Sequence, residues 1–310
     1  MPVPAPDRPQ DRPFHGIWSA ILTPLGRTFA PDHKAFAAHA RFLLDNGCHG
    51  IAPFGTTGEA NSFSVAERMA GLEALVDAGI SPDTLIPGTG CCAGPDTVGL
   101  TRHAVSLGCK GVLMLPPFYY KNPSEEGLYR AFSTVIDRVA DGRLRVLLYH
   151  IPPMSQIPVS HDLIRRLDDA FPGVIAGLKD SSGDWSSIEG FIRAFPELAI
   201  FPGSEQLMLD ALRIGGVGCI SATCNINPHG IRAVFDAYVS GSAETDALQT
   251  KATAARQAIQ AFPVIPAMKR LIAERRKMPE WEQPRAPFLP LDDAAWAALD
   301  EVAAECGYLV

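Results

Sequence analysis

Lys179 and Tyr149 are the two residues whose types and positions most directly suggest chemistry in this chain of 310 residues. Lys179 follows five small or apolar residues, and burial lowers the pKa of a lysine because it disfavours the charged amine. Only the neutral amine attacks a carbonyl, so a desolvated lysine is the usual nucleophile of a Schiff-base enzyme. Tyr149 ends another apolar run, where its phenol could pass protons during imine formation. Taken singly, Lys179 could instead pair with Asp180, and Tyr149 could be a core residue bonded to backbone.

Two loops offer further polar groups for such a site. The segment Gly55-Thr56-Thr57-Gly58-Glu59 has two adjacent hydroxyls and closely spaced backbone N–H groups, which suit a carboxylate. The segment 116–124 carries Tyr119 and Tyr120, which on their own favour a packing role. Neither loop is specific alone, since many turns resemble the first one.

The elements that must position these residues are eight short apolar runs, each followed by a helical pattern. Nearly continuous apolar runs are typical of strands buried on both faces. The runs cover residues 16–24, 50–55, 84–90, 111–117, 145–152, 174–181, 198–204 and 216–225. Helix start signals occur at Asp32, Ser64, Ser124 and Ser160, and Ser64 with Glu67 matches a capping box. This alternation predicts an α/β fold of the (β/α)8 TIM-barrel type, and the absence of GxGxxG after the first run disfavours a dinucleotide-binding sheet.

The same pattern predicts the organisation of the chain. Residues 1–14 would form a flexible Pro-rich tail, residues 15–240 the barrel, and residues 241–310 a helical C-terminal extension packed on it. The extension has two helical stretches, 244–276 and 291–306. Because chemistry in such barrels lies at the carboxyl ends of the strands, Lys179, Tyr149 and both loops are expected at one face.

Composition excludes several classes of partner. The net charge is -7, and the densest basic run, 269–277, has the pattern of a helix with its charge outward, so no nucleic acid is expected. No apolar run reaches the ~18 residues of a membrane span, and the N-terminus lacks the apolar segment of a secretory signal. Seven cysteines without a CxxC pair indicate free thiols and a cytoplasmic location. The eight histidines form no HxH or HExxH motif, so neither a metal nor another cofactor is expected.

Taken together, these segments resemble the family of dihydrodipicolinate synthase and N-acetylneuraminate lyase, the pyruvate-dependent class I aldolases. The resemblance runs from Gly16 to about Pro290. It is carried by GTTGE at 55–59, PPFYY at 116–120, YHIP at 149–152, GLKDSSGD at 177–184, GSE at 203–205 and GVGCISATCN at 216–225.

The resemblance implies a role for each matching residue. Lys179 would be the Schiff-base lysine, Tyr149 the tyrosine that orients and protonates the intermediate, and Thr56 the proton-relay hydroxyl. Thr57 would hold the carboxylate of pyruvate together with the loop N–H groups. Four further positions would line the substrate pocket: Gly203, Ser204, Glu205 and Ile220.

The resemblance also implies a homo-oligomer, a dimer or tetramer. Tyr120 would be lent to the proton relay of a neighbouring subunit. If the loop is one residue longer than in the synthases, Tyr119 would be the tyrosine that joins the neighbouring relay instead.

One position departs from the synthases, which carry after the catalytic tyrosine an arginine that holds the carboxylate of their second substrate. Counting from Tyr149 puts Met154 at that place. A thioether cannot make the bidentate contact of a guanidinium, and a charged hydrogen bond is worth roughly 1.5–3 kcal/mol. The lyases also lack this arginine, but Ser204-Glu205 replaces their own chain-binding pattern.

We therefore expect a Schiff-base-forming lyase or aldolase that makes or breaks a C–C bond, with pyruvate or a related 2-oxo acid and an aldehyde as its partners. Two alternatives use the same imine: 4-hydroxy-tetrahydrodipicolinate (dihydrodipicolinate) synthase proper and a 2-oxo acid dehydratase. A third is a non-catalytic protein that binds a 2-oxo acid, which the retained lysine, tyrosine and threonine residues disfavour. A metal-dependent barrel enzyme is disfavoured by the scattered histidines.

Overall fold

The structure, a computed structural model, describes residues 8–308. Parallel strands form two sheets, in the orders β2-β1-β7 and β3-β4-β5-β6. The strands are β1 (Gly16–Ser19), β2 (Gly50–Ile51), β3 (Val112–Met114), β4 (Val146–His150), β5 (Ile175–Asp180), β6 (Ala199–Pro202) and β7 (Gly218–Ser221).

The two sheets close into one barrel through the predicted third strand. This segment makes only isolated parallel bridges, Leu85 with Ile51 and Gly88 with Leu113. Pro87, between the two bridging residues, has no N–H to donate, which limits continuous pairing. The other junction is a hydrogen bond of 3.3 Å from Val217 N to the oxygen of Ile200. The predicted (β/α)8 barrel is confirmed, with its third strand reduced to two bridges.

The strands are buried on both faces, as the apolar runs predicted. Along β4, Leu147 and Tyr149 belong to the cluster inside the barrel, whereas Val146 and Leu148 pack in the layer between strands and helices. This alternation follows from the two-residue period of a strand. It turns the Tyr149 side chain into the barrel.

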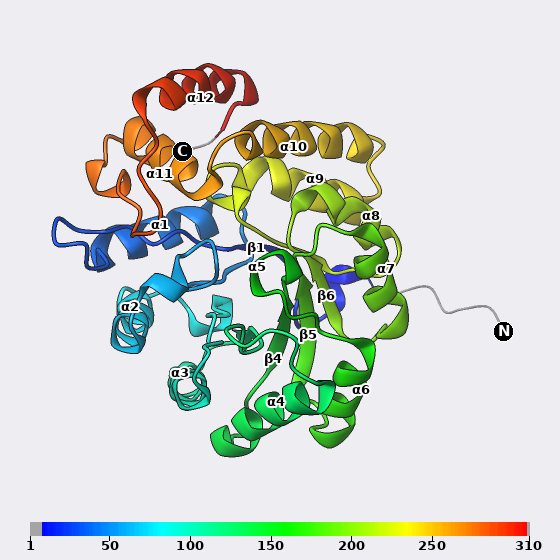
Figure 1. The fold of residues 1–310 in the computed structure, drawn as a ribbon. Coiled ribbons are helices and arrows are strands. Elements are labelled where there is room, and N and C mark those ends of the chain that lie inside the picture. The colour runs from blue at the N-terminus through cyan, green and yellow to red at the C-terminus, as the bar shows by residue number, and fades with distance from the viewer. Residues whose placement is uncertain (1–7, 309–310) are drawn as a thin grey trace.

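Helices surround the barrel as a ring (Figure 1). They are α1 (His33–Asp45), α2 (Val65–Asp77), α3 (Gly94–Ser106), α4 (Glu125–Val139), α6 (His161–Ala170), α7 (Trp185–Ala194), α8 (Met208–Arg213) and α9 (Pro228–Ser240). The short helix α5 (Pro152–Ser155) follows β4 and lies inside this ring (Figure 1). The predicted caps are confirmed, because four side chains accept a backbone N–H in the first turn: Asp32, Ser64, Ser124 and Ser160.

The C-terminal extension forms α10 (Thr245–Gln260), α11 (Val264–Arg276) and α12 (Asp293–Cys306), which lie together outside the ring (Figure 1). The helical stretch predicted over 244–276 is broken before Pro263, which cannot donate the N–H that a continuous helix needs. The three helices share an apolar cluster around Trp281, and this cluster reaches Leu22 and Ile226 of the barrel.

The N-terminal segment is partly packed on the barrel. Residues 1–7 of the predicted tail lie outside the described residues. From Pro9 to Asp11 the chain forms a 3-10 turn, and Phe14 is buried in the cluster inside the barrel. The part of the predicted tail just before residue 15 is therefore ordered and packs on the barrel, and any flexible tail ends before Pro9.

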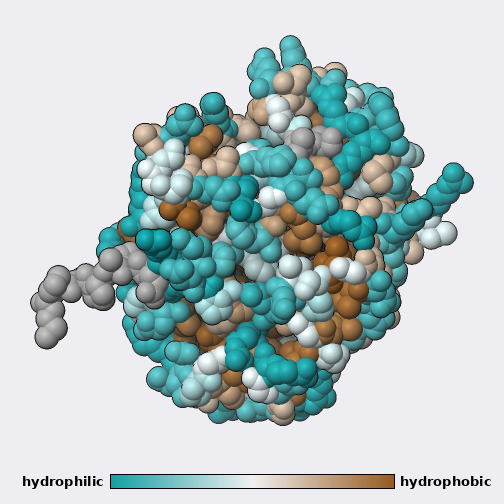
Figure 2. Space-filling view, turned by 180° about the vertical axis from the view of Figure 1, so that it is seen from behind, coloured by the Kyte–Doolittle hydropathy of each residue, from teal (hydrophilic) through white to brown (hydrophobic). Residues whose placement is uncertain are grey.

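Among residues 8–308, no helix combines the length and the apolar character that crossing a membrane requires. Figure 2 shows a face on which hydrophilic residues predominate and apolar residues gather in smaller patches between them.

His39 on α1 is a buried histidine held in its neutral form between the barrel and α11. Its Nε2 lies 3.0 Å from Oδ1 of Asn225, which also accepts the N–H of Leu22, so Nε2 carries the proton. Its Nδ1 lies 3.2 Å from the Arg276 guanidinium and therefore accepts. Burial first, and the charge of Arg276 second, lower the pKa of His39 to about 3.

This histidine should make the protein sensitive to acid. Between pH 6.5 and about 3 the unfolded chain binds a proton at His39 that the folded chain does not, so stability falls as the pH falls through this window. The expected loss is on the order of 5 kcal/mol. Urea unfolding at several pH values should give a shallower dependence for His39→Gln than for the wild type. Equal slopes for the two proteins would contradict this assignment.

Candidate active site

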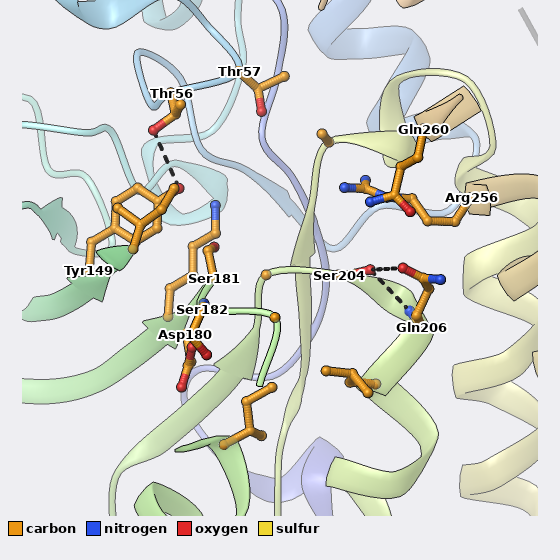
Figure 3. Close-up of a pocket in the computed structure, with 17 residues that line it drawn as sticks. Thr56, Thr57, Tyr149, Asp180, Ser181, Ser182, Ser204, Gln206, Arg256 and Gln260 are labelled. Carbon is orange, nitrogen blue, oxygen red and sulfur yellow. Dashed lines mark hydrogen bonds between the residues drawn. The ribbon is translucent and has the colours of Figure 1, made fainter. Parts of the chain in front are cut away.

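A pocket of about 480 Å³ opens where β4, β5 and β6 end. Its polar side chains come from the loop after β2, from the ends of β4 and β5, from the loop after β6 and from α10 (Figure 3). They include Thr56, Thr57, Tyr149, Lys179, Asp180, Ser181, Ser204, Gln206, Arg256 and Gln260.

Lys179 and Tyr149 lie side by side at the bottom of this pocket. They are register partners in the parallel pair β4–β5, which sends both side chains to the inside of the barrel. The Lys179 amine lies 4.5 Å from the centre of the Tyr149 ring, and the two residues are only 5% and 3% exposed. Within residues 8–308 no carboxylate pairs with this amine; Asp180 instead accepts from Ser182 N and Ser187 Oγ. The amine therefore faces the pocket without a counter-ion, as a nucleophile requires.

Tyr149 is coupled to the loop after β2. Its hydroxyl lies 3.4 Å from Oγ1 of Thr56, and the Thr57 side chain borders the same space (Figure 3). Burial alone would raise the pKa of Tyr149. The charge of Lys179 and a hydrogen bond from Thr56 contribute to the opposing effects that together hold this pKa below its usual 10.0. A phenol of this kind, between an amine and a hydroxyl, can give and take protons.

The loop after β2 is fixed from behind by a buried ion pair. Glu59 has a left-handed backbone conformation, with φ of 57°, and its N–H donates to the oxygen of Thr56. Its carboxylate lies 2.5 Å from the Lys269 amine of α11, and both side chains are fully buried. The other carboxylate oxygen accepts the N–H of Arg285 at 2.6 Å. The C-terminal extension thus holds the loop that carries Thr56 and Thr57.

The predicted outward orientation of the basic run 269–277 is wrong at Lys269. The run is rich in charged residues, as a solvent-exposed helix face is, but the partner of Lys269 lies in a loop more than two hundred positions earlier in the chain. Burial lowers the pKa of Lys269, whereas the Glu59 carboxylate raises it, and the net effect is a lowered pKa.

Lys269→Met should therefore destabilise the protein strongly. The substitution leaves the Glu59 carboxylate buried without its counter-ion, which costs about 3–5 kcal/mol. Lys251→Met, the same change at an exposed position of α10, is the matched control and should alter stability by about 0.5 kcal/mol or less. Urea unfolding measures both, and an equal effect of the two variants would show that the pair does not hold the loop. Addition of Glu59→Gln to Lys269→Met should recover part of the loss.

Six of the residues singled out in the sequence line this one pocket: Thr56, Thr57, Tyr149, Lys179, Gly203 and Ser204. Two others do not reach it. Ile220 is fully buried in the cluster inside the barrel. Glu205 is also fully buried, and it accepts from Ser221 Oγ at 2.5 Å instead of facing the pocket.

Tyr119 and Tyr120 lie outside the pocket on the surface. They are 72% and 81% exposed, and their rings pack edge to face with centres 5.3 Å apart. The role of Tyr120 across a subunit contact stays a prediction. Met154 is 61% exposed and is absent from the residues that line the pocket.

Arg256 and Gln260 are pocket residues that sequence reasoning missed. They come from α10, which begins after the eighth strand–helix unit. Nothing in the helical pattern of this segment distinguishes them from surface residues. Among residues 8–308, no group of three or more histidine, cysteine or acidic side chains has the arrangement of a metal site.

Comparisons with known proteins agree with this geometry. The profile of the dihydrodipicolinate synthetase family matches residues 13–305. A protein called an uncharacterized DapA-like lyase, from Chloroflexus aurantiacus, is 40% identical over 92% of this chain and 94% of its own length. A 4-hydroxy-tetrahydrodipicolinate synthase from Desulforamulus reducens is 32% identical over 74% of this chain and 76% of its own.

Solved structures give the same result. The crystal structure of dihydrodipicolinate synthase from Agrobacterium tumefaciens superposes with a TM-score of 0.86 at 31% identity, covering 94% of this chain and 99% of that one. The chain therefore belongs to the dihydrodipicolinate synthetase family, and it is a lyase of the class I, Schiff-base type.

Proposed function

We propose that Lys179 forms an imine with the ketone of pyruvate or a related 2-oxo acid, and that the enzyme uses this imine to make or break a C–C bond. The observation that carries the proposal is the buried Lys179 amine, which faces the pocket without a carboxylate partner and lies beside the Tyr149 ring. The carboxylate of the 2-oxo acid would lie against Thr57 and the N–H groups of its loop.

Side chains of this pocket can supply every proton transfer that the reaction needs. The neutral amine adds to the ketone carbon, and the carbinolamine loses its hydroxyl as water after Tyr149 protonates it. Thr56, 3.4 Å away, passes protons to and from the phenol. In the cleavage direction the Tyr149 phenolate, left after water is lost, takes the proton of the substrate hydroxyl as the C–C bond breaks. The protonated imine accepts the electron pair of that bond, which releases an aldehyde and leaves an enamine. Tyr149 returns the proton to the enamine carbon, and hydrolysis of the imine then releases the 2-oxo acid and restores Lys179.

Two further features of the proposal concern assembly and location. The exposed, paired rings of Tyr119 and Tyr120 suit a contact between subunits, in which Tyr120 would join the relay of a neighbour. All seven cysteines are free, which favours the reducing cytoplasm.

Parallel assays of condensation and cleavage test the proposal. The purified protein is given pyruvate with a panel of aldehydes that includes aspartate semialdehyde, and the cleavage of hydroxylated 2-oxo acids is followed by pyruvate release. We expect turnover with an aldehyde other than aspartate semialdehyde, because Met154 replaces the arginine expected in the synthases. Fast condensation with aspartate semialdehyde alone would identify a synthase, and loss of water without pyruvate release a dehydratase. Binding without any turnover would leave only the role of a 2-oxo acid binding protein.

A further inference from the structure

The pocket contains a second cationic side chain, Arg256, on the side opposite Tyr149 and Thr56. Arg256 and Gln260 are one helical turn apart on α10, so they share a face, and Figure 3 shows both across the pocket from Tyr149 and Thr56. Among the described residues that line the pocket, Lys179 and Arg256 are the only cations. The Arg256 side chain is 12% exposed.

The guanidinium of Arg256 is anchored through one nitrogen. Nη1 donates to Oγ1 of Thr223 at 2.5 Å, and it lies 3.5 Å from Ser221 Oγ and 4.0 Å from the Glu205 carboxylate. These contacts fix the position of the group from the side of β7. They involve only Nη1, so Nε and Nη2 of the guanidinium remain available to a ligand.

The opposite edge of the guanidinium has no partner within residues 8–308. Nε is buried without a hydrogen bond, and none of the hydrogen bonds of Arg256 involves Nη2. A buried donor without a partner is costly, so such a group in a pocket points to a ligand. The N–H bonds of Nε and Nη2 are parallel, and two oxygens of one oxyanion match them in a bidentate pair.

We infer that Arg256 binds a terminal carboxylate of the substrate, at the end remote from the 2-oxo group. The substrate class is then a 2-oxo acid with a second carboxyl group, or a 2-oxo acid together with a carboxylated aldehyde other than aspartate semialdehyde. The inference rests on the proposed function, because Lys179 must hold the ketone and Thr57 the first carboxylate.

Neighbouring side chains fit this assignment. Gln260, Gln206 and Ser204 add neutral hydrogen-bonding groups around the space beside Arg256 (Figure 3). Asp180 is the one acidic residue among those lining the pocket, and its oxygens are engaged by Ser182 and Ser187. The Glu205 carboxylate accepts from Ser221 and lies 4.0 Å from Nη1, on the side of the guanidinium that Thr223 anchors, and no hydrogen bond joins it to Arg256. Arg256 therefore brings a cation into the pocket from α10, whereas Met154 does not line the pocket.

Imine trapping with borohydride provides the test, because it needs no knowledge of the natural substrate. The half-saturation concentration is measured for 2-oxoglutarate and 2-oxoadipate, and for 2-oxovalerate and 2-oxohexanoate, which have the same chain lengths but no second carboxylate. We expect the wild type to favour the diacids by about 10- to 100-fold. Arg256→Gln should remove this preference, so that each diacid and its monoacid are trapped at similar concentrations, whereas Arg256→Lys should keep part of it.

The controls distinguish failure of the carboxylate subsite at Arg256 from failure of the proposed imine at Lys179. Arg165→Gln, at an exposed position on α6, should behave like the wild type. Normal trapping of pyruvate, with no preference for diacids or with the same preference in Arg256→Gln, would overturn the inference alone. No trapping of pyruvate in the folded wild type would overturn the proposed function. Competition by inorganic phosphate without competition by glutarate would assign the subsite to a phosphate group and overturn the choice of a carboxylate.

Discussion

Lys179→Ala should lower kcat by roughly 10⁴-fold or more, because it removes the nucleophile of the proposed mechanism. Among the described residues that line the pocket, Arg256 is the only other cation, and a guanidinium remains protonated and does not attack a ketone. Steady-state rates of cleavage or condensation measure the effect.

The fold of this variant should be preserved, because the Lys179 amine makes no ion pair within residues 8–308 whose loss would leave a buried charge. Circular dichroism and urea unfolding check this. Lys251→Ala, at an exposed position of α10, is the matched control and should keep full activity. Turnover by a folded Lys179→Ala protein would exclude the proposed chemistry.

Tyr149→Phe should lower kcat by about 10²- to 10⁴-fold, which is the usual contribution of a positioned proton donor. Phenylalanine keeps the buried ring beside Lys179, so the loss reports the hydroxyl rather than the packing. Thr56→Val removes the neighbouring hydroxyl of the relay. If the two groups act as one unit, the double variant should be little slower than Tyr149→Phe alone.

The pH profile distinguishes this role from a structural one. Because the pKa of Tyr149 in the free enzyme is held below 10.0, the wild type should show an alkaline change in kcat/KM below that pH. Tyr149→Phe should lack this change. Thr56→Val should move it to higher pH, because the Thr56 hydrogen bond is one of the effects that lower the pKa of Tyr149. An identical alkaline limb in all three proteins would show that Tyr149 does not titrate in the reaction.

The central part of the site could be predicted because it depends on local patterns. The runs that became β4 and β5 are continuous apolar segments, and Tyr149 and Lys179 stand at corresponding places in them. In a parallel barrel such places are neighbours, so strand order alone brought the two side chains together. The four predicted caps follow from side chains that bond within their own first turn.

The parts that could not be predicted depend on contacts between distant segments. Lys269 has the sequence context of a surface residue and is buried because Glu59 lies opposite it. Arg256 reaches the pocket because α10 packs beside α9 and against the turn at 205–207, which lie earlier in the chain. At 205–207 a short 3-10 turn, capped by Ser204, sets the directions of consecutive side chains, so that Gln206 lines the pocket and Glu205 is buried.

The most direct test of the central claim is reduction with borohydride in the presence of pyruvate, followed by peptide mass spectrometry. The proposed mechanism predicts one stable adduct per chain, confined to the peptide that contains Lys179 and absent from Lys179→Ala. An adduct on another lysine, or no adduct on the folded protein, would contradict the assignment of Lys179 as the residue that forms the imine.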